Sequence, residues 1–490
     1  MEYYKGNPEG GLSPITSKWM HQLFEDQEIL KALVEKYGSP INIHHLPTFA
    51  QTIASFQDVF QSYGIKHQIF YARKANKCKS LVKQAFASGI GVDTASYNEL
   101  KQSIALGGNG GNVVLTAAIK TKDQIELAVR NGVAIILDNV DECMLTDSIA
   151  KELGVIAKVG IRISGFQVDG KKLYSRFGFD VEKAGDFIQT QIGAENTYSN
   201  LLVTGLHFHL DGYSTFQRAS GLSASIALAK NMKDQGYPIR FIDIGGGILM
   251  NYLESEKQWQ EFDLNLRTAV KNNHSNLTFN GNGLGYQLID GELMGELKTY
   301  PYYNKVSGEK FLREILDYSD SETRKSNAQR LIEEELELRI EPGRSLLNQT
   351  GITVAKVAHR KKDSKGQWLI GLEMNMSQMM SSSTDFLLDP FVMYAKQTEP
   401  QEMIDAFFTG AYCLERDILL KRMIKLPKLP EIGDLVAFVN TAGYMMHFFE
   451  TEAHLFELST NLSFSDTPNW PTVLDFLPDE FIEKASVKFI

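Results

Sequence analysis

Eight short runs of β-branched, aromatic and other apolar residues recur along this sequence, each ending in polar or glycine residues. They lie at residues 68–72, 90–93, 112–116, 133–138, 155–163, 202–210, 240–244 and 336–341. Segments between the early runs, such as residues 79–88, 96–106 and 122–131, carry apolar side chains at helical spacing. Eight alternations of strand and helix favour a closed parallel (β/α)8 barrel over residues 41–345, with an open doubly wound sheet as the alternative.

One long segment interrupts the alternation between the seventh and eighth runs. Residues 249–335 are rich in Asn, Gly, Tyr and charged side chains. We expect them to form an insertion in the barrel, with a loop first and then a helix over residues 309–335.

The C-terminal part of the chain has a different pattern. Short alternating runs follow residue 351, at residues 352–358, 367–372, 434–439 and 451–458. They predict a mainly antiparallel β-domain over residues 346–490. We expect residues 1–40 to pack with this domain, and the extended segment 40–44 to cross from it into the barrel.

Composition narrows the classes of function. The 490 residues include 50 Lys and Arg against 60 Asp and Glu, a net charge of −10, without a long basic cluster. Such a chain is poorly suited to binding nucleic acid or anionic membranes. Its three cysteines, Cys78, Cys143 and Cys413, show neither a disulfide framework nor a zinc-binding spacing. The N-terminus lacks the apolar core of a signal peptide, and no apolar run reaches the ~18 residues of a membrane span. We expect a cytoplasmic protein with no nucleic-acid or membrane partner.

Functional side chains of a (β/α)8 barrel gather at the C-terminal ends of its strands. The first run ends in Tyr71-Ala-Arg-Lys-Ala-Asn76, which places Lys74 at the predicted barrel mouth. A neighbouring Arg73 would disfavour the ammonium form of Lys74, as a Schiff-base amine requires. The simpler interpretation of Lys74 alone is a solvated lysine at the start of a helix.

The sixth run contains two histidines, His207 and His209. They are two residues apart, so on a strand they point to the same side. Such a pair could bind a metal ion, although no further ligand is evident at the other strand ends. His209 could instead lie on a flat aromatic cofactor, and His207 could be a packed core residue.

The seventh and eighth runs end in motifs suited to an anion. Gly245-Gly-Gly247 allows close approach of the backbone and presents N–H groups. Glu341-Pro-Gly-Arg344 supplies an arginine after the next run. Barrels often bind phosphate with the loops after strands seven and eight, so the two motifs together predict a phosphate site.

The combination of these motifs resembles the fold-type III pyridoxal-phosphate decarboxylases, which include diaminopimelate and ornithine/arginine decarboxylases. The resemblance covers about residues 40–448 apart from the insertion. Its elements are Tyr71-Ala-Arg-Lys-Ala-Asn76, Val92-Asp93, Ser96, Glu99, Arg162, Arg176-Phe-Gly178, His209, Gly245-Gly-Gly247, Glu341-Pro-Gly-Arg344 and Cys413-x-x-x-Asp417. It implies an alanine-racemase-like barrel with a β-domain, pyridoxal 5'-phosphate as cofactor, amino-acid decarboxylation, and a homodimer with shared active sites.

The resemblance also implies a role for individual residues. Lys74 would form a Schiff base with the cofactor, His209 would stack on its ring, and Glu341 would pair with the pyridine nitrogen. Cys413 would come from the partner subunit and guide protonation of the carbanion. The other cofactor-binding positions would be Asp93, Arg162, Gly245, Gly246, Gly247, Arg344 and Tyr444.

Several positions depart from the family pattern. Leu414 stands where an acidic side chain would meet the distal amine of a diamino substrate, which leaves Glu415 and Asp417 as candidate substrate-binding residues. Gly212 replaces a serine that would contact the phosphate. Residues 373–383 lack the arginine that helps diaminopimelate decarboxylases hold the distal carboxylate. We therefore expect a substrate other than standard diaminopimelate.

Glu341 favours decarboxylation over racemisation, because a carboxylate keeps the pyridine nitrogen protonated, whereas alanine racemases have an arginine there. A racemase, epimerase or other α-carbon lyase stays open as the main alternative. A non-catalytic regulatory relative and a metal-dependent hydrolase built on His207 and His209 are further alternatives.

Overall fold

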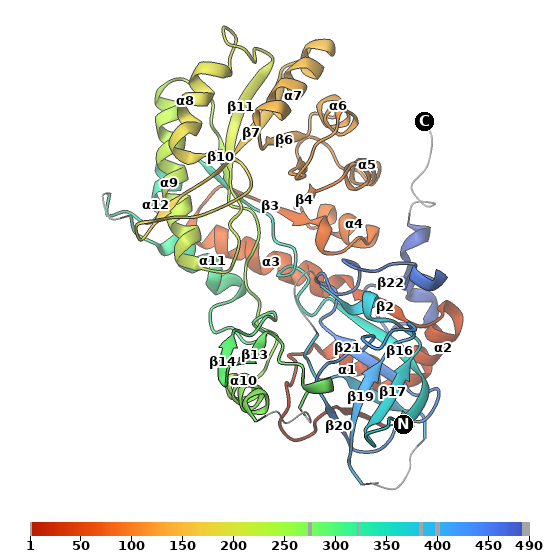
Figure 1. The fold of residues 1–490 in the computed structure, drawn as a ribbon. Helices are drawn as coiled ribbons and strands as arrows, with labels where there is room; N and C mark the ends of the chain where they lie inside the picture. Colours follow the sequence, from red (N-terminus) through yellow and green to blue (C-terminus); the bar gives the residue numbers. More distant parts are fainter. Residues whose placement is uncertain (1, 273–276, 321–322, 382–385, 397–401, 483–490) are drawn as a thin grey trace.

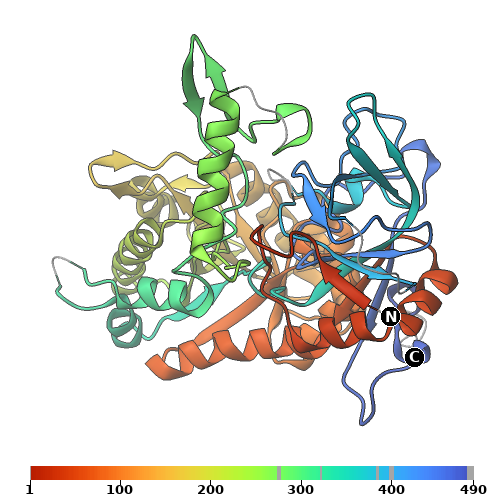
Figure 2. The same ribbon diagram turned by 90° about the horizontal axis from the view of Figure 1, so that it is seen from below.

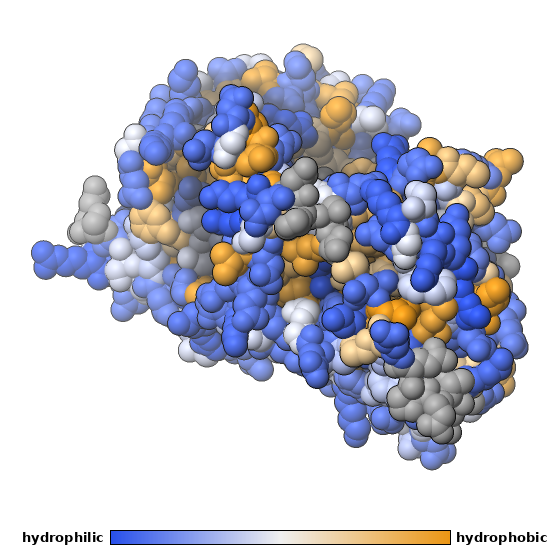
Figure 3. Space-filling model, turned by 60° about the horizontal axis from the view of Figure 1, so that its bottom comes forward, coloured by the Kyte–Doolittle hydropathy of each residue, from blue (hydrophilic) through white to orange (hydrophobic). Residues whose placement is uncertain are grey.

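The computed structural model describes the chain except residues 1, 273–276, 321–322, 382–385, 397–401 and 483–490. A barrel with its surrounding helices forms one part of the molecule, and a β-domain forms the other (Figure 1). In the described residues, no helix has the length and apolar character that crossing a bilayer requires. The face shown in Figure 3 is largely hydrophilic, with hydrophobic side chains in separate groups.

The barrel consists of eight parallel strands. They are β3 (His67–Ala72), β4 (Gly91–Thr94), β5 (Val113–Leu115), β6 (Ala134–Leu137), β7 (Ala157–Ser164), β11 (Leu201–His207), β12 (Phe241–Asp243) and β15 (Glu337–Ile340). Consecutive strands pair in parallel, and the pairing of β15 with β3 closes the ring. Each predicted run forms one of these strands, so the (β/α)8 barrel is confirmed and the open sheet is excluded.

Helices surround the barrel, and most of them follow a polar N-cap residue. They are α3 (Leu46–Tyr63), α4 (Lys79–Ala87), α5 (Tyr97–Ala105), α6 (Lys122–Arg130), α7 (Val140–Glu152), α8 (Val181–Gln191), α9 (Thr215–Asp234), α11 (Gly308–Asp317) and α12 (Asn327–Glu333). The side chains of Ser96, Asn139 and Ser214 each accept a hydrogen bond from an amide in the first turn of the helix that follows. Such caps satisfy amides that have no partner within the helix and fix where it starts.

The β-domain is a mainly antiparallel sheet. Its strands are β1 (Glu2–Lys5), β2 (Ile41–His45), β16 (Gly351–Lys362), β17 (Trp368–Leu372), β18 (Phe391–Tyr394), β19 (Ile404–Thr409), β20 (Ile424–Leu426), β21 (Leu435–Val439), β22 (Thr460–Phe464) and β23 (Leu477–Pro478). The predicted runs at residues 352–358, 367–372 and 434–439 lie in strands. The predicted strand at residues 451–458 is wrong: this segment contains a 3-10 turn, Ala453–Leu455, and β22 begins only at Thr460.

The N-terminal segment belongs to the β-domain side of the molecule. β1 pairs with β18, and β2 pairs with both β16 and β22. The helices α1 (Lys18–Glu25) and α2 (Gln27–Tyr37) share a core cluster with residues of these strands. Since β2 runs to His45, the chain enters the barrel at α3, slightly later than expected.

The segment between β12 and β15 is more structured than the expected loop and single helix. It contains α10 (Glu256–Lys271) and a hairpin of β13 (Tyr286–Ile289) and β14 (Glu292–Gly295), which stand out in green in Figure 2. The predicted helix over residues 309–335 is wrong as one element, because α11 and α12 are separate helices. Residues 321–322 between them lie outside the described part of the chain.

The two parts of this segment pack on different neighbours. α11 packs against α9 and α3, so it belongs to the ring of helices around the barrel. The residues before it share a core cluster with the β-domain, and the Met423 amide donates to the Leu277 carbonyl at 3.0 Å. The inserted part therefore joins the β-domain at the C-terminal end of the barrel.

Candidate functional site

A cavity of about 670 Å³ lies at the C-terminal ends of the barrel strands. Side chains from the barrel, the β-domain and the insertion line it together. The lining residues that the sequence predicts are Lys74, His209, Gly246, Gly247, Glu341, Arg344 and Tyr444. The tertiary structure therefore brings together residues that are far apart in the chain, and the size is typical of a small-molecule site.

Lys74 stands directly after β3, in the 3-10 turn Arg73–Ala75. Its Nζ lies 3.7 Å from Oδ2 of Asp93 at the end of β4. Oδ1 of Asp93 accepts a hydrogen bond from the Thr116 hydroxyl, whereas Oδ2 has no hydrogen-bond partner in the described part of the chain. Burial lowers the pKa of Lys74, but the carboxylates around it outweigh burial and raise that pKa above its usual value.

The expectation that Arg73 suppresses the charge of Lys74 is wrong. The Arg73 guanidinium is buried on the other side of the turn, where it donates to the Glu99 carbonyl at 2.9 Å and to the Ser103 hydroxyl at 3.3 Å. Neighbours in sequence thus point to different environments. The charge of Lys74 is set by the carboxylate of Asp93 from the adjacent strand.

His209 and the glycine loop after β12 are in direct contact. The Gly246 amide donates to Nδ1 of His209 at 3.1 Å, which leaves the proton of the neutral ring on Nε2. Burial, and then the cations of Lys74 and Arg162, lower the pKa of His209 well below its ordinary value. A Cβ on Gly246 would lie 2.5 Å from the Glu341 carbonyl oxygen, so the loop requires glycine at this position.

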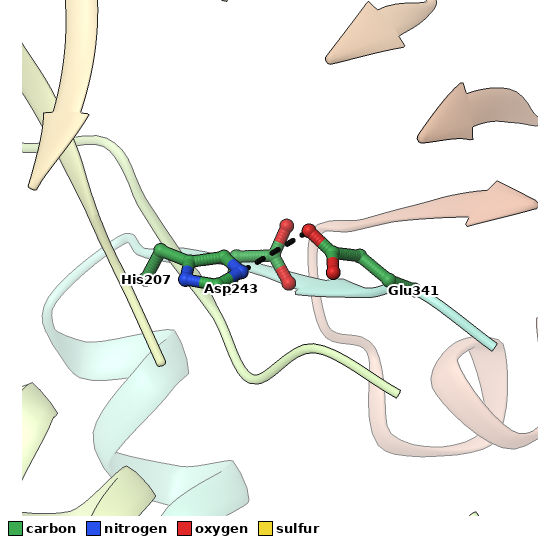
Figure 4. A group of neighbouring side chains, drawn as sticks. All are labelled: His207, Asp243 and Glu341. Carbon is green, nitrogen blue, oxygen red and sulfur yellow. Dashed lines mark hydrogen bonds and ion pairs between the residues drawn. The ribbon is translucent and has the colours of Figure 1, made fainter. Parts of the chain in front are cut away.

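His207, Asp243 and Glu341 form a buried cluster from three consecutive strands or their ends. Their side chains point toward one another, and Nε2 of His207 lies 3.2 Å from Oε1 of Glu341 (Figure 4). Burial lowers the pKa of His207 to about 4 and raises the pKa of Asp243 to about 8. Burial and the Asp93 charge raise the pKa of Glu341 to about 8. At neutral pH, His207 is therefore neutral, and the neighbouring carboxyl groups of Asp243 and Glu341 retain a proton between them.

This cluster bears on the metal-binding hypothesis for the two histidines. His207, Asp243 and Glu341 offer one ligand atom each within 4.8 Å of one another. The expectation that no further ligand lies near His207 is therefore wrong. His209 contributes no ligand atom to this described group, because its Nδ1 accepts from Gly246. The pair His207 and His209 does not form the metal site that their spacing suggested.

Residues 48–280 match the family model of the pyridoxal-dependent decarboxylases, over their pyridoxal-binding domain. The chain therefore carries the pyridoxal-binding domain of the fold-type III pyridoxal-phosphate-dependent decarboxylases. Its cofactor class is pyridoxal 5'-phosphate and its reaction class is amino-acid decarboxylation, as the sequence motifs predicted. These comparisons leave the substrate unidentified.

Individual relatives are distant. The chain is 28% identical over 86% of its length to a Sinorhizobium fredii protein described as uncharacterized protein y4yA, of which the match covers 86%. It is 28% identical over 48% of its length to the diaminopimelate decarboxylase of Campylobacter jejuni, of which the match covers 59%. The structure of diaminopimelate decarboxylase from M. jannaschii, in complex with L-lysine, matches this chain with a TM-score of 0.67 and 18% sequence identity. The match covers 92% of this chain and 91% of that chain. That likeness shows a shared fold.

The cavity fits the cofactor of the decarboxylase family. An amine (Lys74), a glycine loop and a buried carboxyl group (Glu341) line one cavity. Two buried carboxylate oxygens nearby, Oδ2 of Asp93 and Oδ2 of Asp243, have no hydrogen-bond partner in the described residues. A group with an aldehyde, a phosphate and a protonated ring nitrogen matches these donors and acceptors.

Arg162, Arg344 and Tyr444 occupy different positions around this decarboxylase site. Arg162 is buried, with Nη1 3.6 Å from Oδ1 of Asp138. The Arg344 guanidinium lies over the rings of Tyr300 at 4.5 Å and Tyr444 at 5.3 Å. The Tyr444 amide donates to the Ala75 carbonyl at 2.8 Å, which holds the β-domain against the loop of Lys74.

Cys413, Glu415 and Asp417 do not join the cavity of their own chain. The described residues that line it include none of the three, and the side chains of Cys413 and Glu415 are exposed. Asp417 is buried, and its carboxylate accepts from the amides of Tyr412 at 2.7 Å and Met376 at 2.8 Å. Within this chain, Asp417 therefore holds a loop and is not directed at a ligand.

The cavity residues that sequence reasoning missed include Tyr213, Arg218, Thr299 and Tyr300. Tyr213 and Arg218 follow the sixth strand, where a search of the strand ends could have included them. Thr299 and Tyr300 come from the insertion, and no pattern in the sequence places that segment over the barrel.

Proposed function

We propose that this decarboxylase uses Lys74 as its Schiff-base lysine and acts on an amino acid other than standard diaminopimelate. The observation that carries the proposal is that the Lys74 amine and the buried Glu341 carboxyl group line the same cavity at the barrel mouth. When bound, pyridoxal 5'-phosphate supplies a pyridinium ring that accepts the electron pair left by loss of CO2. The residues of the chain bind and orient the reactants around that chemistry.

Glu341 is the residue that would keep the ring nitrogen of the cofactor protonated. His207 holds one of its oxygens at 3.2 Å, and the surrounding barrel excludes water from it. A carboxylate in such surroundings strongly favours a positively charged partner. This position of Glu341 supports decarboxylation over racemisation, because a protonated ring nitrogen strengthens the electron sink.

The other residues hold the cofactor in place. His209, with Nδ1 fixed by the Gly246 amide, presents its ring in the cavity, where it would stack on the cofactor. Gly245, Gly246 and Gly247 leave room for the phosphate beside Arg344 and Tyr444. Arg162 and Asp93 balance the charges around Glu341 and Lys74: Asp93 acts on the pKa of both groups, and Arg162 acts on that of Glu341.

The substrate departs from diaminopimelate in this proposal for reasons of sequence and structure. Leu414 replaces the acidic residue of the family pattern and is exposed. In the segment 373–383 no arginine occurs, and residues 382–383 lie outside the described part of the chain. Thr299 and Tyr300 of the insertion also line the cavity, so an element outside the family pattern shapes the substrate pocket.

We also propose a cytoplasmic homodimer with shared active sites. Cys413 is exposed and does not line the cavity of its own chain, as expected for a residue that acts in a partner subunit. Exposed apolar side chains lie beside it, at Leu414, and on the loop that packs against Tyr412, at Leu455 and Phe456. All three cysteines are free thiols, which suits a reducing compartment.

The first test is a mass-spectrometric screen of the cofactor-loaded protein against L- and D-amino acids, including diamino and dicarboxylic ones. Loss of CO2 from one of them supports decarboxylation and identifies the substrate class. Unchanged mass with altered chirality would establish a racemase instead. Lys74→Ala should abolish the cofactor absorbance of the protein, and an unaltered spectrum would refute the assigned lysine.

Subunit mixing tests the shared site. Neither Lys74→Ala nor Cys413→Ala should be active alone, whereas a mixture should regain part of the activity because some dimers hold one intact site. Sedimentation of the unmodified protein should give a dimer. Absence of rescue in a mixture shown to exchange subunits would overturn the shared site.

A further inference from the structure

Arg218 is a buried cation in the first turn of α9 without a matching anion. Its side chain is 1% exposed, and Nη2 donates to the Leu210 carbonyl at 2.9 Å. Nε lies 3.4 Å from the Gly246 carbonyl, and Nη1 has no partner among the described residues. Leaving a buried donor without a partner is unfavourable, and more so when the group is charged.

Two other buried arginines of this chain have a carboxylate beside them. Arg330 pairs with Asp320 at 3.4 Å, and Arg422 pairs with Asp389. Asp211 is the carboxylate whose charge favours the charged form of Arg218. It is an exposed residue, and it forms no ion pair with Arg218 in the described structure. Burial lowers the pKa of Arg218 to about 10, so it still carries its charge at neutral pH. A buried charge of this kind requires an anion to compensate it.

The position of Arg218 indicates which anion this is. It lines the cavity together with Gly246 and Gly247 of the glycine loop. A Cβ on Gly247 would lie only 2.1 Å from Nη2 of Arg218, so the guanidinium packs directly on this loop. The Phe311 ring lies 5.8 Å from the guanidinium carbon.

The glycine loop itself offers fewer donors than its sequence suggests. The Gly245 amide donates to Oδ1 of Asp243 at 2.9 Å, and the Gly246 amide donates to Nδ1 of His209 at 3.1 Å. Two of the three glycine amides are therefore occupied by side chains of the same chain. A phosphate beside this loop needs donors from elsewhere, and Nη1 of Arg218 is an unused donor at that place.

We propose that Arg218 binds the phosphate group of pyridoxal 5'-phosphate through Nη1, on the glycine-loop side of the cavity. The proposal rests on the proposed function, since it takes the cavity at Lys74 as the cofactor site. Gly212 provides no side chain at the loop before α9, so Arg218 is the residue of this region that supplies a charged contact. Arg344 lies on the tyrosine side of the same cavity.

The test compares two ligands that differ only in the phosphate. Pyridoxal 5'-phosphate and pyridoxal are titrated by absorbance into the cofactor-free forms of the wild type, Arg218→Gln and Arg218→Lys. Arg218→Gln should weaken binding of pyridoxal 5'-phosphate roughly tenfold to hundredfold and leave pyridoxal binding unchanged, with Arg218→Lys intermediate. Arg330→Gln is the matched control, because it removes a buried arginine outside the cavity, and it should keep the wild-type ratio.

An unchanged ratio of the two affinities in Arg218→Gln, or an equal loss for both ligands, would overturn the proposal. A wild type that does not prefer pyridoxal 5'-phosphate, or a Lys74→Ala variant with the wild-type spectrum, would instead refute the proposed function. If Arg218→Gln does not fold, inorganic phosphate serves as the probe. It should raise the melting temperature of cofactor-free wild type and Arg330→Gln more than that of Arg218→Lys, and equal rises would overturn the proposal.

Discussion

Asp243 gives the buried carboxyl cluster a measurable effect on stability. It is fully buried, its pKa is raised to about 8, and Oδ1 accepts from the Gly245 amide at 2.9 Å. In the unfolded chain this group titrates near pH 4. Between pH 5 and pH 7 the folded protein therefore holds one proton more than the unfolded chain at this residue, and the free energy of unfolding falls as the pH rises.

One proton corresponds to about 1.4 kcal/mol per pH unit, or about 3 kcal/mol from pH 5 to pH 7. The unfolding entropy of a 490-residue chain is about 1 kcal/mol per kelvin at ~2.1 cal/mol/K per residue. The Asp243 contribution should thus lower the melting temperature of the cofactor-free protein by about 3 °C over this range. Asp243→Asn removes the titration but keeps an oxygen for the Gly245 amide, so this part of the decline should disappear.

The assay is thermal unfolding of the cofactor-free wild type and Asp243→Asn at pH 5, 6 and 7. The difference between the two melting temperatures is compared at each pH. Asp186→Asn removes an exposed carboxylate on α8 and serves as the control, with the slope of the wild type expected. If the melting temperatures of the wild type and Asp243→Asn change equally with pH, the folded protein does not hold this proton. The reasoning about the cluster would then be refuted.

Three further variants test other parts of the site. Glu341→Gln should retain the cofactor but lower the decarboxylation rate roughly hundredfold, measured as CO2 release, and a wild-type rate would contradict its role. Gly246→Ala places a Cβ 2.5 Å from a backbone oxygen and should weaken cofactor binding at least about tenfold by absorbance titration, unlike the control Gly111→Ala. Tyr300→Ala removes the ring 4.5 Å from Arg344 and should weaken cofactor binding about fivefold, whereas Tyr300→Phe keeps the ring and should bind as the wild type.

The barrel could be predicted from the sequence because each buried strand is a short run of β-branched and aromatic residues. The β-domain was harder to predict, because apolar side chains there do not always mean burial. Leu455 is 94% exposed in the segment that was predicted to be a strand. The interrupted helix at residues 309–335 did have a signal: Ser326 and Gln329 form a capping box, which marks the start of a new helix.

The candidate site, too, could be predicted only in part from the sequence. Barrel closure turns the order of strands into a ring, so residues at strand ends such as Lys74 and Glu341 could be predicted to converge. Their electrostatics could not, because the charge of Lys74 depends on a carboxylate of the next strand and not on its sequence neighbour Arg73.

The position of the insertion could be predicted neither from the pattern of strands nor from neighbours in the sequence. Its position over the cavity depends on packing with the β-domain, a contact between segments far apart in the chain. Lys74, His209 and Glu341, which we propose to hold the cofactor, therefore come from the part of the fold that the sequence specifies most regularly. Those that face the rest of the cavity, Thr299 and Tyr300, come from the part that it specifies least. Differences in substrate between this chain and its relatives should accordingly lie in the insertion, while the cofactor chemistry stays with the barrel.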